Sequence, residues 1–296
     1  MNQQSKSKRA LIFVNRHARQ GGDKLNEALE QLEKLGFDLI EKKIKNAEQI
    51  PTVISQQKDN VDLVIIGGGD GTLNAAVEGL VDSQLPLGIL PLGTANDLAR
   101  TLGIPTTLPE ACQVIANGKM QRIDLGWVNG KYFFNVASLG LSVKITRQLT
   151  KDVKQKWGVF AYAITAGKAV WESRPFHASI RINGEEPILV KALQIAVGNG
   201  RYYGGGMTVA EDAAIDDRRL DLYTLEAKHW WHILALMPAM KQGNHASWPG
   251  VRGFQGQEIE ITTYNKKRSI NTDGEITTTT PATFRVIPQA LPVYVP

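Results

Sequence analysis

Two glycine-rich segments place acidic and hydroxyl side chains directly after runs of apolar residues. The first reads VIIGGGDGTLN over residues 64–74, and the second reads GILPLGTANDLAR over residues 88–100. Glycine lets a backbone approach a ligand closely and adopt positive φ, and the N–H groups that begin a helix favour an anion. A carboxylate in such a loop, here Asp70, is suited to a divalent cation held between it and phosphate groups. Together the two segments predict a nucleotide site.

Neither segment matches the common phosphate-binding fingerprints. A Walker A loop ends in Gly-Lys-Ser/Thr, whereas Gly71 is followed by Thr72 and Leu73, and the dinucleotide fingerprint needs a glycine where Thr72 stands. Two interpretations without a ligand stay open. The first segment is then a tight strand-to-helix turn, and the second is a well-capped helix with Thr94 as N-cap and Asp97 at the third helical position.

The elements that must position these segments alternate between strand and helix patterns. Strand-like runs and helix-like runs follow one another at residues 10–14, 23–35, 37–44, 48–58, 61–67, 72–81, 87–90 and from 94 onward. This order predicts an α/β domain with a doubly wound parallel sheet. In such a sheet the carboxyl ends of successive strands open on one ligand-binding crevice.

From about Asp124 the pattern changes to short β-rich runs separated by Gly, Asn and Pro. Such runs predict a mainly antiparallel sheet or β-sandwich. We expect the α/β domain to cover residues 1–125, with the tail 287–296 packing back on it, and the β-rich domain to cover residues 126–286. A cleft is expected between them, and helical inserts are expected at residues 154–171 and 229–241.

The composition restricts the classes of partner without choosing one. The net charge of +5 and the pI near 9.2 permit attraction to anionic lipid, nucleotide or nucleic acid. Cys112 is the single cysteine, so an intrachain disulfide is excluded and a reducing compartment fits best. No apolar run reaches the ~18 residues that span a bilayer, so we expect any membrane contact to be peripheral.

The segments GGGDGTLN and PLGTANDLAR together resemble the diacylglycerol kinase catalytic domain family, in particular its bacterial YegS-like and DgkB-like lipid kinases. NAD kinases and phosphofructokinases share the GGDGT core, but PLGTAND is not typical of NAD kinases. Further segments fall in family order, namely RIDLG, FFNVASLGLSVKI, VGNGRYYGGGM, DDRRLDL and NTDGE. The resemblance implies an NAD kinase/diacylglycerol kinase-like α/β domain and a β-sandwich that receives the lipid acceptor.

The resemblance also implies roles for single residues. It assigns the ATP phosphates to the two glycine segments, through Gly68, Gly69, Asp70, Gly71, Thr72, Asn74 and Thr94. It assigns the catalytic base to Glu275 in the Asp-Gly-Glu motif, which agrees with the need of a lipid hydroxyl to lose its proton during phosphoryl transfer. The alternative is that Asp273 and Gly274 form only a hairpin turn and that Glu275 is solvated.

A structural Mg²⁺ site is implied in the segment AIDDRRLD, which covers residues 214–221. The ligands would be the carboxylate of Asp217 and the backbone carbonyls of Ala214 and Arg219, with Asp124 linking the metal to the active site through water. Arg218 stands where glycine is common in the family. If the loop needs positive φ there, we expect the metal site to be weakened.

These observations predict an ATP- and Mg²⁺-dependent kinase that phosphorylates a hydroxyl of a membrane lipid, with diacylglycerol as the leading acceptor, at the cleft between the domains. We expect a cytoplasmic protein that contacts the membrane transiently and has no nucleic-acid partner. A homodimer is compatible with the sequence. Two alternatives stay open: an NAD-kinase-like enzyme with a soluble acceptor, and a nucleotide- or lipid-binding regulator without turnover.

Overall fold

The computed structural model describes residues 7–14, 22–42, 46–148, 173–208, 212–226 and 248–296. The chain divides into two compact units, one made of Met1–Asp124 with Pro288–Pro296 and the other of Leu125–Ile287. The helical inserts expected at residues 154–171 and 229–241 lie outside the described residues. Among the described residues, no helix has the length and apolar character needed to cross a membrane.

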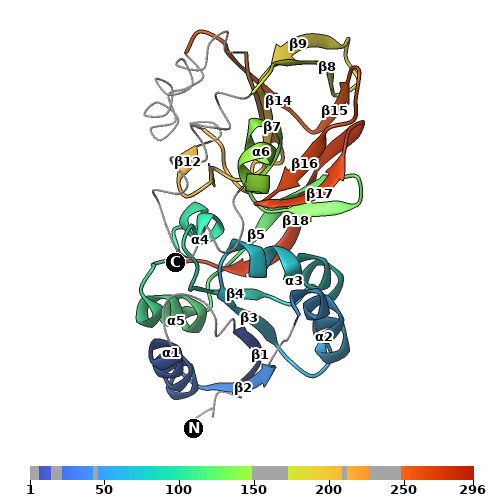
Figure 1. The fold of residues 1–296 in the computed structure, drawn as a ribbon. Helices are drawn as coiled ribbons and strands as arrows, with labels where there is room; N and C mark the ends of the chain where they lie inside the picture. Colours follow the sequence, from blue (N-terminus) through green and yellow to red (C-terminus); the bar gives the residue numbers. More distant parts are fainter. Residues whose placement is uncertain (1–6, 15–21, 43–45, 149–172, 209–211, 227–247) are drawn as a thin grey trace. The chain divides into compact units, whose positions relative to one another are not determined.

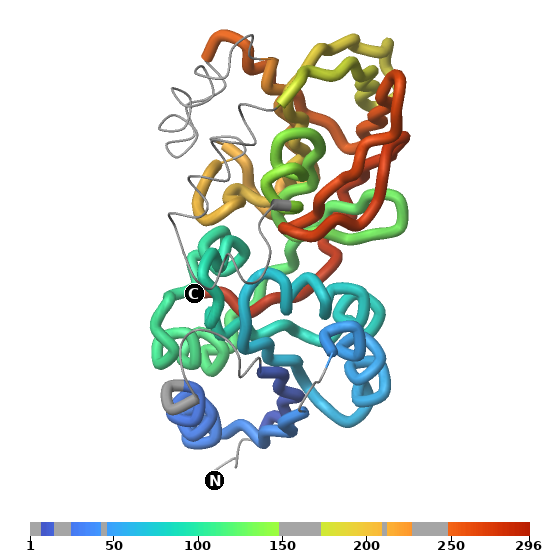
Figure 2. The backbone as a smooth tube through the Cα atoms, in the orientation of Figure 1, coloured from blue at the N-terminus to red at the C-terminus, as the bar shows by residue number. Residues whose placement is uncertain are grey.

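The first unit contains a parallel sheet with the strand order β2-β1-β3-β4-β18. Its bounds are β1 (Lys8–Val14), β2 (Phe37–Lys42), β3 (Leu63–Gly68), β4 (Leu87–Pro91) and β18 (Ala282–Tyr294). The end of the chain returns to this unit (Figure 2), where Val293 of β18 pairs in parallel with Leu87 of β4. Strands β3 and β4 are buried along their whole length, as a parallel sheet covered on both faces requires.

Helices cover both faces of this sheet (Figure 1). Helix α1 packs against α5 on one face, and α2 packs against α3 on the other. The bounds are α1 (Gly22–Lys34), η1 (Ala47–Gln49), α2 (Ile50–Gln57), α3 (Asp70–Ser83), α4 (Asp97–Thr101) and α5 (Leu108–Asn117). The predicted doubly wound α/β architecture is therefore confirmed.

The second unit contains two antiparallel sheets. The first has the order β14-β13-β10-β7-β16-β17, and the second has the order β18-β15-β8-β9, with the hairpin β5-β6 pairing to β18. Their bounds are β5 (Met120–Val128), β6 (Lys131–Phe133), β7 (Val136–Gly140), β8 (Phe176–Ile182), β9 (Ile188–Ala192), β10 (Gln194–Gly198), β13 (Leu220–Leu225), β14 (Val251–Gly256), β15 (Glu258–Thr263), β16 (Ser269–Thr272) and β17 (Glu275–Thr279). Helix α6 (Leu141–Gln148) follows β7, and the short strands β11 (Tyr202–Tyr203) and β12 (Met207–Thr208) form a ribbon.

One hydrophobic core joins the two sheets of the second unit. Alternate residues of strands from both sheets contribute to it, including Leu139, Ile195, Leu222, Ile270, Ile180, Ile261 and Phe284. Strand β8 shows the pattern that produces this core, because buried and more exposed residues alternate along it. The predicted antiparallel β-sandwich is therefore confirmed.

Candidate functional site

The first glycine segment connects the end of β3 to the start of α3. Gly69 is the N-cap of α3 with an extended backbone, and its carbonyl accepts the N–H groups of Thr72 at 2.9 Å and Leu73 at 3.2 Å. The first N–H groups of a helix lack intrahelical acceptors, and Gly69 offers no side chain to cap them. Because the helix dipole also favours negative charge at this end, the loop is suited to a phosphate group.

The second glycine segment lies beside the first. Residues Gly68 and Pro91 pair at the ends of the neighbouring parallel strands β3 and β4, and Leu92 N–H donates to the Gly68 carbonyl at 3.0 Å. The carboxylate of Asp70 completes the connection, because its Oδ1 accepts the Leu98 N–H at 3.1 Å. The structure therefore brings both predicted segments together at one edge of the sheet.

Close packing explains why glycine occupies this edge. A Cβ atom on Gly93 would lie 2.5 Å from the Cα of Gly69, and one on Gly68 would lie 2.7 Å from the Thr72 hydroxyl oxygen. The expectation of positive φ is wrong here, since none of the glycines between residues 67 and 71, nor Gly93, has positive φ. The two loops touch through their backbones, which only glycine permits.

The predicted cap of the second helix is also wrong. Helix α4 begins at Asp97, and its N-cap is Asn96, which has a φ of 49°. The Asn96 side chain holds the turn from both sides, because its Oδ1 accepts the Gly93 N–H at 2.9 Å and its Nδ2 donates to the Gly93 carbonyl at 3.0 Å. Asparagine tolerates this left-handed conformation better than most residues. Thr94 is thereby left exposed in the loop.

Asn74, one turn into α3, has a buried side-chain oxygen. Within the described residues, no donor forms a hydrogen bond with this Oδ1. A buried acceptor without a donor is costly, so a water molecule or a ligand hydroxyl is expected there.

In the second unit, the segment NTDGE forms a tight hairpin between β16 and β17. Asp273 and Gly274 have φ values of 46° and 96°, as expected for a type I′ turn. The Gly274 N–H donates to Asn271 Oδ1 at 2.8 Å. Glu275 begins β17 and is exposed, and its carboxylate has no hydrogen bond or salt bridge within the described part of the chain.

The carboxylate of Asp273 anchors this hairpin. It accepts three successive backbone N–H groups, from Phe134 at 2.6 Å and from Asn135 and Val136 at 3.0 Å each. The sequence pattern indicates Asp273 only as a turn residue and does not reveal this contact with three backbone N–H groups. The turn-forming residue types Asn271, Asp273 and Gly274 were the available signal for a structured loop.

The segment VGNG, residues 197–200, contacts the same backbone segment around Phe134 and Asn135. Asn199 Nδ2 donates to the Phe134 carbonyl at 2.8 Å, and the N–H groups of Asn199 and Gly200 donate to the Asn135 carbonyl at 2.8 and 3.1 Å. A Cβ atom on Gly200 would lie 2.6 Å from Asn135 Oδ1. The segments FFNVASLG, VGNG and NTDGE therefore come together in the second unit and hold the turn that carries Glu275.

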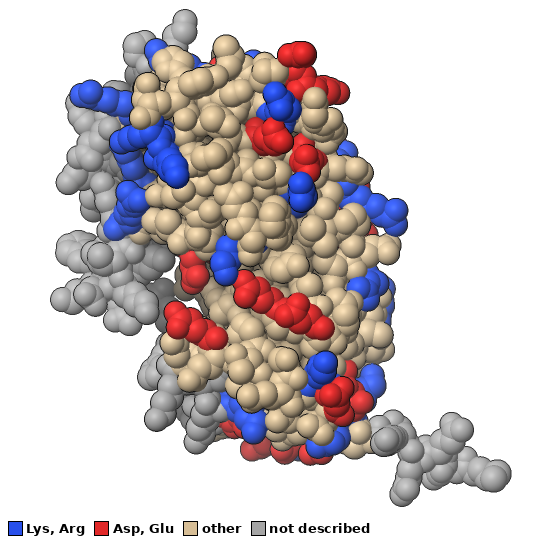
Figure 3. Space-filling view, turned by 90° about the vertical axis from the view of Figure 1, so that its right-hand side faces the viewer, with Lys and Arg blue, Asp and Glu red and all other residues tan. Residues whose placement is uncertain are grey.

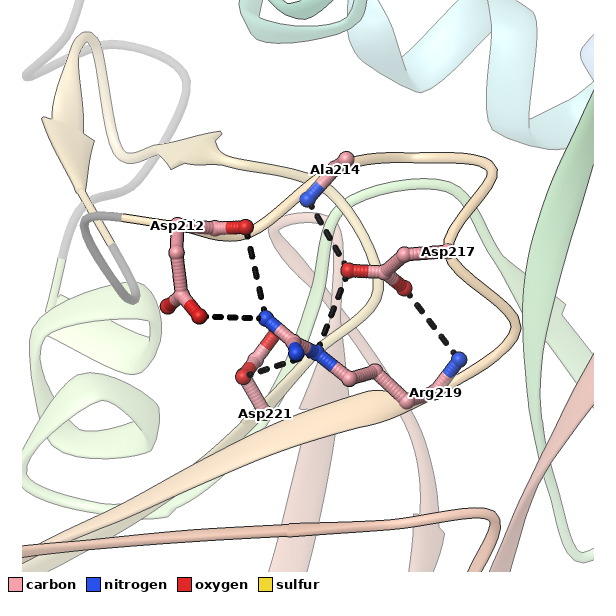
Figure 4. A network of polar contacts seen from close by, with 5 residues as sticks. All are labelled: Asp212, Ala214, Asp217, Arg219 and Asp221. Carbon is pink, nitrogen blue, oxygen red and sulfur yellow. Dashed lines mark hydrogen bonds and ion pairs between the residues drawn. The ribbon is translucent and has the colours of Figure 1, made fainter.

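The loop expected to hold Mg²⁺ is organised around an arginine (Figure 4). The Asp217 carboxylate accepts the N–H groups of Ala214 and Arg219, each at 3.2 Å. The Arg219 guanidinium lies among three carboxylates, with Nη2 2.8 Å from Asp212 Oδ2 and with Nε 3.2 Å from Asp217 Oδ2 and 3.6 Å from Asp221 Oδ1. The Asp217 carboxylate thus meets nitrogen donors.

This arrangement does not fit the implied Mg²⁺ site. Mg²⁺ requires oxygen ligands at short distance. The carboxylate of Asp217, however, already accepts the N–H groups of Ala214 and Arg219 and forms an ion pair with the Arg219 guanidinium. Nowhere in the described ranges do three or more His, Cys, Asp or Glu side chains form a group that could hold a metal ion. Arg218 has a φ of 61°, so the loop does require positive φ at that position.

The same contacts shift the pKa values of the charged groups. The hydrogen bond from Arg219 lowers the pKa of Asp212. Burial raises the pKa of Asp221 to about 6, because desolvation outweighs the attraction of Arg219. Although burial acts in the opposite direction, the hydrogen bond to Asp212 and the charges of Asp221 and Asp217 raise the pKa of Arg219. The guanidinium therefore remains charged throughout the physiological range.

Asp124 lies in the first unit, where its side chain is buried. Its Oδ1 accepts the Gln289 N–H at 2.7 Å and so connects β5 to the C-terminal part of β18. Gln289 has a φ of 50°, which marks a local departure from regular strand geometry. The structure therefore gives Asp124 a role in holding the end of the chain, and its part in a metal network stays a prediction.

Comparisons with known proteins agree with these two units. The family model described as diacylglycerol kinase catalytic domain matches residues 9–128, and the model described as YegS C-terminal NAD kinase beta sandwich-like domain matches residues 135–295. A diacylglycerol kinase of Staphylococcus saprophyticus is 29% identical, with 92% of this chain and 90% of the relative covered. A protein of Shewanella frigidimarina with the name probable lipid kinase YegS-like is 30% identical, with 85% of this chain and 82% of the relative covered.

Solved structures show the same relationship. A crystal structure of a diacylglycerol kinase from Bacillus anthracis has a TM-score of 0.82 at 25% identity and covers 98% of this chain and 97% of its own. Yeast NADH kinase, at 12% identity and a TM-score of 0.53, shares the fold over 98% of this chain and 83% of its own. The chain therefore belongs to the diacylglycerol kinase family, with a diacylglycerol kinase catalytic domain followed by a YegS-type β-sandwich domain.

Proposed function

We propose that this protein is a lipid kinase that transfers the γ-phosphate of ATP to a hydroxyl group of a membrane lipid, with diacylglycerol as the leading acceptor. Family membership supports ATP as the donor, and the lipid kinases among its relatives support a lipid acceptor. The observation that carries the proposal is the pair of glycine loops at the ends of β3 and β4, joined by Asp70 and Leu98.

The first loop is proposed to hold the phosphates of ATP. The backbone of Gly68, Gly69 and Gly71 would lie along the phosphate chain at the start of α3, with the hydroxyls of Thr72 and Thr94 as further donors. Mg²⁺ belongs to the substrate in this proposal, because it arrives bound to ATP. The charge of Asp70 would act beside that complex, and the unmatched Asn74 Oδ1 would accept a hydrogen bond from the nucleotide or a bound water.

Glu275 is proposed as the catalytic base. As the lipid hydroxyl oxygen bonds to the γ-phosphorus, its proton passes to the Glu275 carboxylate, and the bond from the γ-phosphorus to the bridging oxygen breaks to release ADP. An exposed carboxylate on a turn anchored by Asp273 supports this assignment. The reaction further requires that the two units bring Glu275 and the ATP phosphates to the same acceptor.

The test is a transfer assay with γ-labelled ATP and a panel of acceptors: diacylglycerol, monoacylglycerol, a hydroxyl-bearing sphingolipid and NAD. We expect label in lipid products, with diacylglycerol the best acceptor. Label in NAD alone would instead support an NAD-kinase-like reaction. Bound ATP without label in any acceptor would support a non-catalytic binding protein.

A further inference from the structure

The loop of residues 212–221 in the second unit contains a concentration of negative charge around one cation. Asp212, Asp217 and Asp221 all lie within ion-pair distance of the Arg219 guanidinium, at 2.8, 3.2 and 3.6 Å (Figure 4). The side chain of Asp221 is only 5% exposed and that of Arg219 is 28% exposed, so water screens this pair weakly. Asp212 is the solvated member of the group.

Two buried atoms show how much the loop depends on this cation. Within the described residues, neither Asp221 Oδ1 nor Arg219 Nε has a hydrogen-bond partner, although they lie 3.6 Å apart. The buried carboxylate oxygen is therefore compensated by charge attraction rather than by a hydrogen bond. Removing the guanidinium would leave this buried carboxylate without a neighbouring cation and with only the side chain of Gln255 as a hydrogen-bond partner, which is unfavourable.

The backbone of the loop is arranged to suit this internal cation. The N–H groups of Ala214 and Arg219 point toward the Asp217 carboxylate, and this orientation holds the carboxylate against the guanidinium. For a metal ion to bind Asp217 through the same face, the Arg219 side chain would have to leave. The positive φ of 61° at Arg218 turns the chain so that the next residue, Arg219, folds back over the loop.

We propose that Arg219 supplies from within the chain the positive charge that the implied site would take from a divalent metal ion, so that the loop folds without Mg²⁺. The divalent metal requirement of this protein is then confined to the Mg²⁺ that accompanies ATP. Arg219 is a structural residue in this inference and touches neither substrate.

Metal binding to the full-length wild-type protein gives the first test. Without nucleotide, titration with Mn²⁺ is followed by electron paramagnetic resonance and by calorimetry, in parallel with Asp217→Asn. We expect both proteins to give the same result, because the wild-type loop binds no metal. A wild-type Mn²⁺ site that Asp217→Asn abolishes would overturn the proposal.

The second test removes the Arg219 guanidinium and asks whether Mg²⁺ or Mn²⁺ can replace it. In EDTA and without nucleotide, Arg219→Leu is expected to lower the apparent melting temperature by about 5 °C, because it removes the cation beside the buried carboxylate of Asp221. Millimolar Mg²⁺ or Mn²⁺ should raise the melting temperature of the variant back toward that of the wild type, because an ion that binds only the folded state stabilises that state. The melting temperature of the wild type should not change. No rescue of the variant would overturn the proposal.

Two further variants separate charge from packing. Arg219→Lys keeps a positive charge, so its melting temperature should be close to that of the wild type and should not change when Mg²⁺ is added. A melting temperature and a Mg²⁺ response like those of Arg219→Leu would contradict the charge argument. Arg252→Leu removes a comparable arginine, which contacts the single carboxylate of Glu226 at 2.7 Å, and should gain no response to Mg²⁺. If Arg219→Leu folds only when Mg²⁺ is present during refolding, that result also supports the proposal, because the metal then replaces the guanidinium.

Discussion

Asp70 combines a structural contact with the charge needed for the proposed chemistry. Its Oδ1 accepts the Leu98 N–H at 3.1 Å and so joins the two glycine loops. Its negative charge lies in the first turn of α3, where the helix dipole favours it. Substitution can separate the two contributions, because asparagine retains an oxygen acceptor without the charge.

We predict that Asp70→Asn keeps the apparent melting temperature within about 2 °C of the wild type but lowers kcat/KM for ATP by about tenfold or more. Asp70→Ala should lower both, because it also loses the contact to Leu98, which is worth about 1 kcal/mol. Thermal unfolding and steady-state kinetics with Mg·ATP measure the two effects. Normal ATP kinetics in both variants would mean that the loop is only structural.

The contact between the two loops that follow β3 and β4 depends on two glycines, Gly69 and Gly93. A Cβ atom on Gly93 would lie 2.5 Å from the Gly69 Cα, so Gly93→Ala must push the loops apart. We predict a loss of about 1–3 kcal/mol in the free energy of unfolding and a weakening of ATP binding by about tenfold or more. Chemical denaturation and nucleotide titration measure these quantities.

Gly253→Ala is the matched control, because a Cβ atom there meets nothing within 4 Å and the residue lies in β14. It should leave ATP binding unchanged. Equal effects of the two substitutions on ATP binding would contradict the explanation that the loops need close backbone contact.

The pairing of helices α1 and α5 encloses the single cysteine. Cys112 is fully buried, its Sγ lies 3.7 Å from the Ala28 carbonyl, and burial raises the pKa of its thiol to about 11. Because the folded pKa lies above the ordinary value, the stabilising effect of the neutral thiol is fully present below pH 9.0 and is lost as the pH rises through about 11. We predict that the native protein does not react with a thiol reagent at neutral pH, whereas unfolding in urea exposes one reactive thiol per chain. Rapid labelling of the native protein would contradict the packing of α1 on α5.

Regular elements were predictable where local pattern determines them. The strands at residues 10–14, 61–67 and 87–90 and the helix near residues 72–81 follow from apolar runs and periodicity, and the structure contains β1, β3, β4 and α3 there. The start of α4 was not predictable from capping preference, because Asn96 adopts a left-handed conformation that depends on its side-chain contacts with Gly93. By residue type alone Asn96 is at least as good an N-cap as Thr94, so the choice of Thr94 did not follow from residue type.

The sequence indicated which residues belong to the candidate site, but it did not indicate the contacts that these residues make across the folded molecule. Asp273 meets backbone groups 137 to 139 positions earlier in the chain, so no local pattern reveals that anchor. The ion pairs of Arg219 with Asp212, Asp217 and Asp221 could not be predicted for a different reason. Residue spacing shows carboxylates close together, and only the folded loop shows that a guanidinium lies among them.

The expected contact with membranes would depend on the charge of the whole surface. Lysine and arginine side chains are spread over the face seen in Figure 3, with acidic side chains between them, and the net charge is +5. Each basic residue near an anionic surface is worth about 1 kcal/mol and is screened within a Debye length. We predict that the protein sediments with anionic vesicles at low salt and that added salt releases it. Equal sedimentation with neutral and anionic vesicles would contradict electrostatic recruitment.

In the proposed reaction, Glu275 removes the proton of a lipid hydroxyl while the glycine loops hold ATP. The most direct measurement compares the wild type with Glu275→Gln in the transfer of label from γ-labelled ATP to diacylglycerol, with ATP binding measured on both proteins. We predict that the wild type labels diacylglycerol and that the variant turns over about 10²-fold more slowly or worse, with ATP affinity nearly unchanged. Equal turnover of the two proteins would contradict the assignment of the base, and the absence of labelled lipid with the wild type would contradict the proposed function.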